Sequence, residues 1–187
     1  MAGGLGDPLA AIRGGLVVSV QAPPGSPLRD PAHMAAMARA AEAGGARAVR
    51  AEGARDIAAI RDAIDLPMIG LRKRESPDTP VVITPSLDDA REVAAAGADV
   101  IALDATGRPR ADGRGPGELM DQLMRELPLP LLADVDCYAA GPASVPSPRT
   151  CKGSPLSGKG ISTRSKSFGT IVFSKVARAS SRISPPE

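Results

Sequence analysis

The sequence predicts an α/β protein built on a parallel sheet, and three observations support this. Short apolar runs alternate with segments of helical periodicity, at intervals of about 20–30 residues. The apolar runs are continuous, which is typical of parallel strands that are buried on both faces. Segments 40–50 and 93–103 also resemble each other, because each contains a helix end, a Gly-Ala turn and a strand. A recurring helix–strand unit is therefore expected along the chain.

The N-terminal part predicts one short helix, one strand and one longer helix. The short helix is expected from Pro8 to Arg13, where two glycines follow. The run 15–21 is apolar and β-branched and is bounded by Gly and Pro, which indicates a buried strand. Asp30 provides an N-cap and Pro31 a first-turn proline, so the second helix is expected to begin there and to end near Glu42. Its predicted apolar face consists of Met34, Met37, Ala38 and Ala41.

A strand that ends in three adjacent cations follows in the middle of the chain. The strand is expected at 67–73, after a strand at 46–50 and a helix with an apolar stripe at Ile57, Ile60 and Ile64. Side chains alternate along a strand, so Lys73 should share a face with Ile69 and Leu71, opposite to Arg72 and Arg74. Lys73 is the only lysine before residue 152.

The remaining elements repeat the same pattern. A capping box, Ser86-Leu-Asp-Asp89, predicts a helix that ends near Ala96. The other expected elements are a short extended piece at 81–84, a strand at 99–104, a loop at 107–116, a helix at 118–127 and a strand at 130–134.

Five strands with polar residues at their carboxyl ends match the first five units of a (β/α)₈ barrel, with a flavodoxin-like open sheet as the alternative. The composition then changes, since residues 141–187 hold eight Lys or Arg but a single acid. We therefore expect a partial barrel domain at 1–143 and, at 144–187, a basic tail rich in Ser, Pro and Lys. This tail is expected to be irregular, disordered or read from a shifted frame, and only 169–174 is a candidate strand. A barrel truncated in this way would leave its fifth strand as an unpaired edge.

The composition also excludes several classes of protein. The single histidine, His33, argues against a histidine metal site and a Ser/His triad, and the two cysteines have neither metal nor disulfide spacing. No apolar run is long enough to span a membrane, and no secretory leader is evident. A cytoplasmic protein without a cofactor or a metal is therefore expected.

A lone amine at the carboxyl end of a buried strand lies where α/β barrels build active sites, so Lys73 is a candidate catalytic residue. A solvated charge cluster that ends the strand is the alternative interpretation of the same residues. Side-chain alternation and the position at a strand end are compatible with both interpretations, so these residues alone do not decide between them.

Six segments in order resemble the N-acetylmannosamine-6-phosphate 2-epimerase family over residues 13 to about 143. They are 15–21, 48–53, 67–74, 83–85, 101–110 and 132–135. The resemblance implies a TIM barrel of amino-sugar and sialic-acid breakdown. It also implies interconversion of N-acetylmannosamine-6-phosphate and N-acetylglucosamine-6-phosphate by proton transfer at C2. The family's later segments, which carry its second catalytic Glu and its phosphate-binding loops, are not found here, and this makes activity an open question.

The resemblance assigns a role to seven residues. Lys73 corresponds to the proton-transferring lysine, and a dry, cation-rich pocket is expected around it. The positions implied to contact the sugar phosphate are Gln21, Arg50, Asp104, Arg108, Arg110 and Asp134. The carboxylates also fit a second interpretation as N-caps or as ion-pair partners of Arg50.

The sequence is also compatible with two other functions. The first is a barrel of the aldolase type, in which the Lys73 amine forms a Schiff base with a carbonyl substrate. The second is an inactive remnant whose basic tail binds an acidic partner. Nucleic acid is the weaker partner because the tail lacks aromatic residues at stacking spacing. The sequence does not decide between a monomer and a homodimer.

Overall fold

The structure, a computed structural model, describes residues 7–136 and 169–173, and the expected elements are present there. The helices are α1 (Pro8–Ile12), α2 (Pro31–Ala43), α3 (Ala54–Arg61), α4 (Leu87–Ala95) and α5 (Pro116–Glu126). The strands are β1 (Val17–Val20), β2 (Ala48–Glu52), β3 (Met68–Leu71), β4 (Val100–Asp104), β5 (Leu131–Val135) and β6 (Gly169–Phe173). The predicted caps also form, since Asp30 accepts from the Ala32 amide at 2.8 Å and Ser86 accepts from the Asp89 amide at 3.2 Å.

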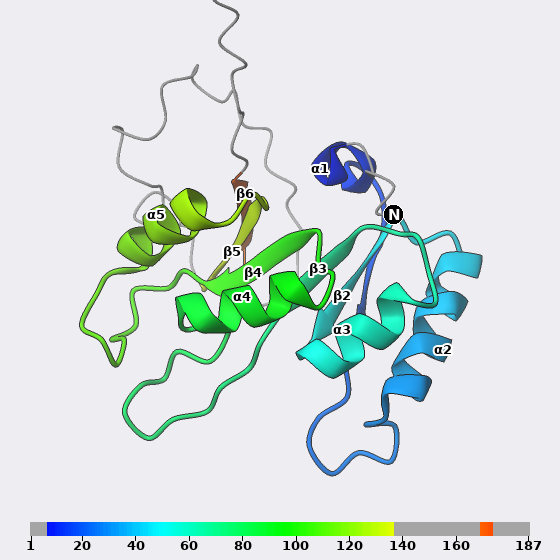
Figure 1. Cartoon of the computed structure of the whole chain (residues 1–187), viewed down its shortest axis with the longest axis horizontal. Coiled ribbons are helices and arrows are strands. Elements are labelled where there is room, and N and C mark those ends of the chain that lie inside the picture. The colour runs from blue at the N-terminus through cyan, green and yellow to red at the C-terminus, as the bar shows by residue number, and fades with distance from the viewer. Residues whose placement is uncertain (1–6, 137–168, 174–187) are drawn as a thin grey trace, which may run out of the picture.

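Strands β1 to β5 lie side by side in chain order and all run parallel. This order contradicts the flavodoxin-like alternative, in which the first strand lies inside the sheet. Helices α2 to α5 cover one side of the sheet (Figure 1). Their buried side chains, such as Met34, Ile60 and Leu123, pack against strand residues such as Val49 and Leu103. This arrangement is that of consecutive units of a β/α barrel.

The opposite face of the sheet is the inner face of the barrel. A smaller apolar cluster lies there, formed by Ile69, Leu71, Val100, Ala102 and Leu132. Helix α1 packs against this cluster and lies at the end of the sheet away from the long βα loops (Figure 1). The polar side chains of a site are therefore expected at the other end of the same face.

The sheet is curved, with its inner face concave. The register pairs Arg50 of β2 with Ile69 of β3, and Ile69 with Val100 of β4. Extended to β5, the same level of the sheet falls at Pro130, which is four residues before Asp134. In a flat sheet β2 and β5 are three strand spacings apart, about 14 Å. The Arg50 guanidinium nevertheless contacts the Asp134 carboxylate directly. A contact across this distance and stagger requires curled and tilted strands, as in a barrel.

The connection between β3 and α4 enters the sheet. Strands β3 and β4 pair at only two positions, because the returning segment 82–84 takes over at their carboxyl ends. There the Thr84 amide donates to the Arg72 carbonyl at 2.7 Å, and the Asp104 amide donates to the Ile83 carbonyl at 2.9 Å. Lys73 and Ile83 also form an isolated antiparallel bridge. The predicted extended piece at 81–84 thus holds the backbone segment 72–74, which contains Lys73.

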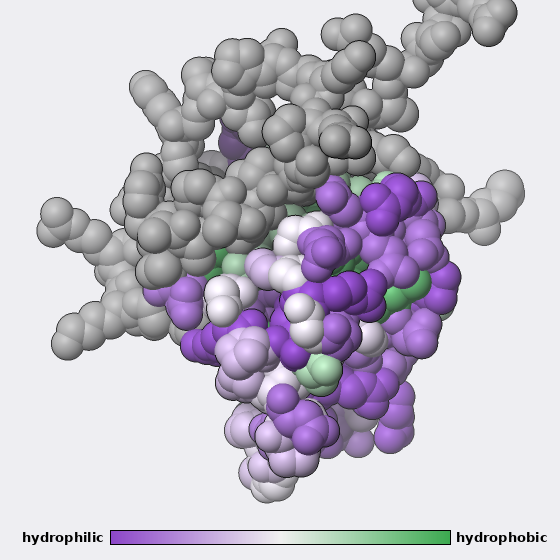
Figure 2. Space-filling view, turned by 90° about the vertical axis from the view of Figure 1, so that its left-hand side faces the viewer, coloured by the Kyte–Doolittle hydropathy of each residue, from purple (hydrophilic) through white to green (hydrophobic). Residues whose placement is uncertain are grey.

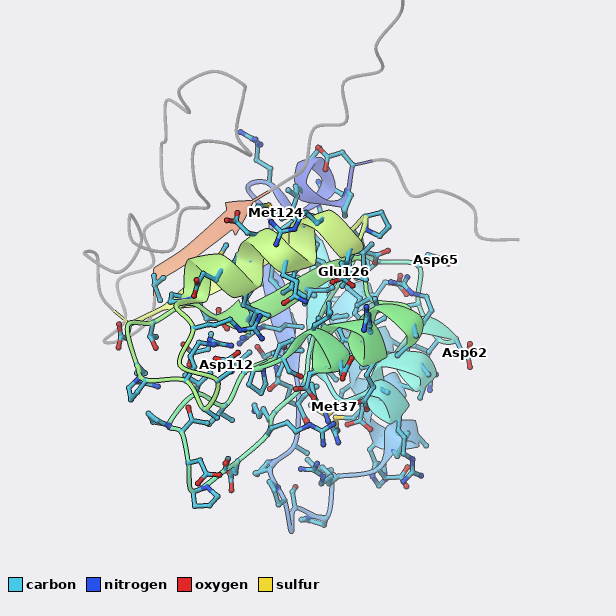
Figure 3. The ribbon with its side chains drawn as sticks, turned by 60° about the vertical axis from the view of Figure 1, so that its left-hand side comes forward. Met37, Asp62, Asp65, Asp112, Met124 and Glu126 are labelled. Atoms are coloured by element: carbon cyan, nitrogen blue, oxygen red, sulfur yellow. The ribbon has the colours of Figure 1, made fainter. Side chains whose placement is uncertain are left out.

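Two expectations about exposed edges and faces are wrong. The fifth strand is not an unpaired edge, because β6 pairs with β5 in antiparallel orientation from Leu131–Phe173 to Val135–Gly169. β6 lies within the stretch predicted as the only candidate strand of the tail; the rest of the tail lies outside the described residues. Met37 is not part of the buried face of α2, since it is 37% exposed; Figure 3 labels it beside this helix. Ala38, beside it, occupies the buried position.

Within the described ranges, no helix is both long enough and apolar enough to cross a membrane. The side of the molecule shown in Figure 2 is mostly hydrophilic where residues are described.

Candidate active site

Five of the predicted site residues meet at the carboxyl end of the inner face. Their neighbours Val20, Val49, Leu103 and Ala133 point toward the helices, so alternation turns the predicted residues inward. The five residues are Gln21, Arg50, Lys73, Asp104 and Asp134. They come from the ends of five consecutive strands, which is how barrel enzymes assemble an active site.

Lys73 contacts the residue that follows β1. Its Nζ donates to Gln21 Oε1 at 2.9 Å, and Arg72 and Arg74 point instead toward Glu92 and Asp89 of α4. The predicted opposition of the lysine and the two arginines is confirmed. The expected dry pocket is not found, because the Lys73 side chain is exposed. The residue lies two positions beyond the end of β3, where the curved sheet opens to solvent.

Arg50 and Asp134 form a direct ion pair across the concave face. Arg50 Nε is buried and has no hydrogen-bond partner within the described part of the chain. Asp134 is 9% exposed. Its burial, the largest effect, raises the pKa of this carboxyl above its ordinary value; the Arg50 guanidinium opposes the shift and the Asp104 carboxylate adds to it. The pair therefore holds a buried carboxylate that has a raised affinity for a proton.

Asp104 is held rigidly beside Asp134. The two residues are partners in the β4–β5 register. Asp104 Oδ1 accepts from the Thr106 amide at 2.9 Å and from Thr106 Oγ1 at 2.7 Å, so one oxygen shapes the start of the next loop. Its Oδ2 lies 3.9 Å from Arg108 Nη1, and Arg108 also lies 3.8 Å from Asp136. Arg108 is thus loosely held at the rim of the site.

Arg110 differs from the other six predicted residues. Its guanidinium is buried, and it donates to the Asp104 carbonyl at 3.1 Å and to the Pro85 carbonyl at 2.7 Å. Burial lowers the pKa of this guanidinium. These contacts join the β4–α5 loop to the segment before α4, and the predicted substrate contact of Arg110 stays a prediction.

Two residues that the sequence interpretation did not select also lie at this end. Glu52 is 8% exposed and follows Arg50 on the same face of β2, so side-chain alternation would have found it. Thr84 is fully buried with a φ of 44°, which is rare for a β-branched residue. No sequence signal marks Thr84, because its position depends on how the returning segment enters the sheet.

We expect the Thr84→Val variant to lose about 1–3 kcal/mol in free energy of unfolding. The Thr84 hydroxyl donates to the Ala102 carbonyl at 2.6 Å and accepts from the Arg72 amide at 3.2 Å, and valine removes both bonds while keeping the shape. The measurement is urea denaturation. Thr84→Ser is the control, because it keeps the hydroxyl and should lose less than about 1 kcal/mol. Equal losses in both variants would contradict this role of the hydroxyl.

The raised pKa of Asp134 predicts how stability depends on pH. A carboxyl whose pKa is higher in the folded than in the unfolded protein stabilises the fold fully below about pH 3.9, its unfolded value, and this contribution is lost as the pH rises through the folded value. The free energy of unfolding of the wild type, minus that of Asp134→Asn, should therefore fall as the pH rises through the acid range. Urea denaturation at several pH values measures it, and a constant difference would refute the shift.

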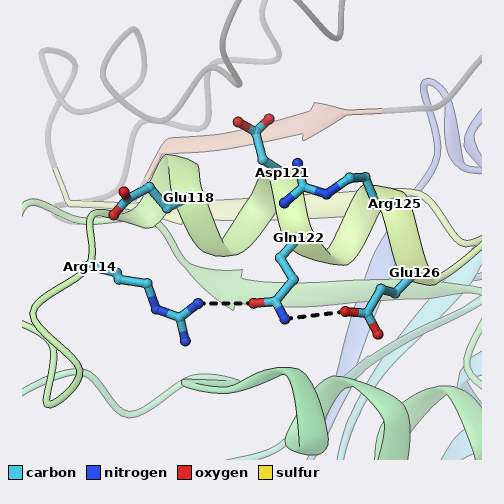
Figure 4. A pocket seen from close by; sticks show the side chains of 6 residues that line it. All are labelled: Arg114, Glu118, Asp121, Gln122, Arg125 and Glu126. Carbon is cyan, nitrogen blue, oxygen red and sulfur yellow. Dashed lines mark hydrogen bonds between the residues drawn. The ribbon is translucent and has the colours of Figure 1, made fainter.

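An open polar hollow lies away from this site, on the outer surface of α5 (Figure 4). Gln122 accepts from Arg114 Nη1 at 3.1 Å and donates to Glu126 Oε1 at 3.2 Å, so these side chains are bonded to one another. No group of three or more side chains suited to a metal occurs among the residues that the structure describes. The concave face is therefore the candidate site, because it has both the predicted site residues and the position at the carboxyl ends of the strands.

The fold and the site define a β/α-barrel class of protein in which Lys73 is the only lysine at the carboxyl ends of the described parallel strands. The sequence profile described as "Putative N-acetylmannosamine-6-phosphate epimerase" (NanE) matches residues 34–163. The chain belongs to this family. The matched residues extend past 143, the predicted end of the barrel domain.

Relatives with known names agree with this assignment. The chain is similar to the "Putative N-acetylmannosamine-6-phosphate 2-epimerase" of Cutibacterium acnes, with 51% identity over 126 residues that make up 67% of this chain and 54% of the relative. The Synechococcus elongatus protein of the same name is 42% identical over 151 residues, 80% of this chain and 65% of the relative. The chain thus spans between about half and two thirds of the length of these relatives.

A solved structure has the same fold. It was determined in a structural and biochemical characterisation of the N-acetylmannosamine-6-phosphate 2-epimerase from Clostridium perfringens. The TM-score is 0.67 at 36% sequence identity, and the match covers 71% of this chain and 58% of that chain. The β/α units described above are therefore those of the epimerase barrel.

Proposed function

We propose that this chain converts N-acetylmannosamine-6-phosphate to N-acetylglucosamine-6-phosphate by inverting the configuration at C2. The C2 proton is acidic only beside a carbonyl, so the sugar must react in its ring-opened form. A base removes the proton, its electron pair forms an enolate with C1, and a proton then returns to the opposite face of C2. One proton leaves and one is added, so no oxidant or cofactor is needed.

The observation that carries the proposal is the contact between Lys73 and Gln21 on the concave face. The amine is held at 2.9 Å from the Gln21 carbonyl oxygen, at the carboxyl end of the strands and open to a ligand. An uncharged amine can accept the C2 proton on one face of C2, and the proton returned to the opposite face has to come from a second donor, such as solvent. The Gln21 contact orients the amine without neutralising its charge.

The neighbouring charges suit a phosphorylated, polyhydroxylated ligand. Arg108 is loosely held by Asp104 and Asp136, and the Arg50 side chain is partly exposed on the same face, so both guanidinium groups can donate to oxygen atoms of a sugar phosphate. Asp104 and Asp134 offer carboxylate oxygens to its hydroxyl groups. Positive groups near C1 would stabilise the enolate oxygen.

The direct test is proton exchange at C2. The purified chain is incubated with N-acetylmannosamine-6-phosphate in D₂O, and the C2 proton is followed by NMR. Loss of the C2 signal together with appearance of the second epimer is expected. No exchange above the rate without protein would refute the proposal for this chain.

The Schiff-base alternative predicts a different outcome. If Lys73 formed an imine with the open-chain sugar, borohydride would trap a covalent adduct on this lysine. The exposed Lys73 amine is accessible enough for such a reaction. Proton transfer forms no adduct, so mass spectrometry of the borohydride-treated protein separates the two mechanisms.

Several sequence predictions stay predictions. They are the division into a 1–143 domain and a 144–187 tail, the cytoplasmic location, the weak affinity for nucleic acid and the absence of a cofactor. The choice between monomer and homodimer is likewise open to measurement of the mass in solution.

A further inference from the structure

Glu52 is a buried carboxylate at the site that the proposed chemistry does not use. It lies at the carboxyl end of β2, two residues after Arg50, and it is 8% exposed. A buried carboxylate is unfavourable unless donors surround it. Three groups from two other parts of the chain do so, namely the Lys73 amide, Arg72 and Arg29. We infer that Glu52 is a positioning residue for Lys73.

The first contact acts on the backbone of Lys73 itself. The Lys73 amide donates to Glu52 Oε1 at 3.4 Å, and the same oxygen lies 3.9 Å from Arg72 Nη1. Both distances are long for single hydrogen bonds, so the carboxylate acts mainly through its charge on two adjacent donors. It thereby holds the segment that follows β3 against the end of β2.

The second contact acts on the partner of the Lys73 amine. Glu52 Oε2 lies 3.7 Å from Arg29 Nη2, and Arg29 Nη1 donates to the Ala22 carbonyl at 3.3 Å. Ala22 follows Gln21, whose side chain accepts from Lys73 Nζ. The contacts therefore form a closed ring from Glu52 through the β1–α2 loop to the lysine and back. Glu52 holds both chain segments that bring the amine and the glutamine together.

The charge of Glu52 is needed for this arrangement. Arg29, Arg72 and Lys73 bring three cations to one end of the sheet, and Glu52 contacts both Arg29 and the Arg72–Lys73 segment, while Glu92 is near Arg72 only. Buried ion pairs contribute little to stability compared with apolar side chains of equal volume. A role in placing Lys73 thus explains a buried carboxylate here better than a gain in stability.

The test uses Lys73, which is the only lysine within the described residues. Labelling with ¹⁵N-lysine gives five backbone signals, from Lys73 and from lysines 152, 159, 166 and 175. In Glu52→Gln we expect the Lys73 amide to exchange with D₂O about three- to tenfold faster, because the amide side chain is a weaker acceptor. The other four signals serve as internal references and should not change.

Asp56→Asn is the matched control. Asp56 lies in the first turn of α3, close enough to Glu52 and Arg29 to feel their charges, but the structure gives it no bond to Lys73. Its removal should leave Lys73 exchange at the wild-type rate. If Glu52→Gln does not fold, Arg29→Gln interrupts the ring from its exposed side and should speed the same amide. An unchanged Lys73 rate in the folded variant overturns the inference.

The catalytic consequence rests on the proposed function. In Glu52→Gln we expect kcat for C2 inversion to fall about tenfold with KM within about twofold, because the misplaced amine affects the transition state more than substrate binding. An unchanged kcat in a variant with faster Lys73 exchange would show that this placement is not needed for catalysis, which overturns the catalytic part. If the wild type shows no turnover, the proposed function fails, while the exchange experiment still decides the role of Glu52.

Discussion

Lys73→Met is expected to lower kcat/KM for C2 inversion by about 10³-fold or more, with no loss of stability. General acid–base groups contribute roughly 10²–10⁴-fold, and no other lysine lies within the described residues to replace the amine. Because the side chain is exposed and, among the described residues, its amine bonds with Gln21 alone, the fold should not depend on it. Deuterium exchange at C2 measures the rate, and urea denaturation measures stability.

Lys73→Arg makes this test sharper. Arginine keeps the positive charge and the length of the side chain but does not lose its proton in proteins. We expect it to be as inactive as Lys73→Met, which separates proton transfer from simple attraction of the phosphate. Arg55→Met is the matched control, since it removes an exposed cation from α3 outside the site and should retain activity. Substantial activity in Lys73→Arg would contradict proton transfer by this residue.

Asp134→Ala is expected to cost about 2–4 kcal/mol in free energy of unfolding. Removing one member of a buried ion pair costs about 3–5 kcal/mol because the other charge is left unpaired. The Arg50 side chain is 26% exposed, so water compensates part of this loss. Arg50 Nε already lacks a partner in the described part of the chain, so the guanidinium has few other contacts to rely on. Urea denaturation near neutral pH measures the difference.

The double variant Arg50→Met, Asp134→Leu tests the cause of that loss. Replacing both charges with apolar side chains should restore most of the stability, because neither charge is then buried alone. C2 inversion should be lost in the double variant, because both side chains belong to the candidate site. Glu126→Ala is the control: it breaks an arginine–carboxylate pair on the surface, with Arg91, and should cost less than about 1 kcal/mol. A double variant as unstable as Asp134→Ala would show that the loss comes from packing instead of charge.

The sequence alone determined the order of the elements and the direction of the side chains around the candidate lysine. Caps such as Asp30 and Ser86 act within a few residues, and alternation along a strand is equally local. Lys73 could therefore be placed opposite to Arg72 and Arg74, and the structure agrees. In the structure, Arg50, Asp104 and Asp134 follow the same alternation and face one side of the sheet. The family resemblance implies a reaction for these residues, but it does not say which side chains contact one another.

Only the tertiary structure decided which of these side chains touch. Arg50 reaches Asp134 because the sheet curls and its strands are staggered, and neither property can be read from one strand. Arg110 is bonded to two backbone carbonyls, a contact that the sequence did not indicate because the two loops it joins meet only in the fold. Glu52 gains its role in the same way. Local sequence determines the direction of a side chain, but its partner depends on where distant segments lie.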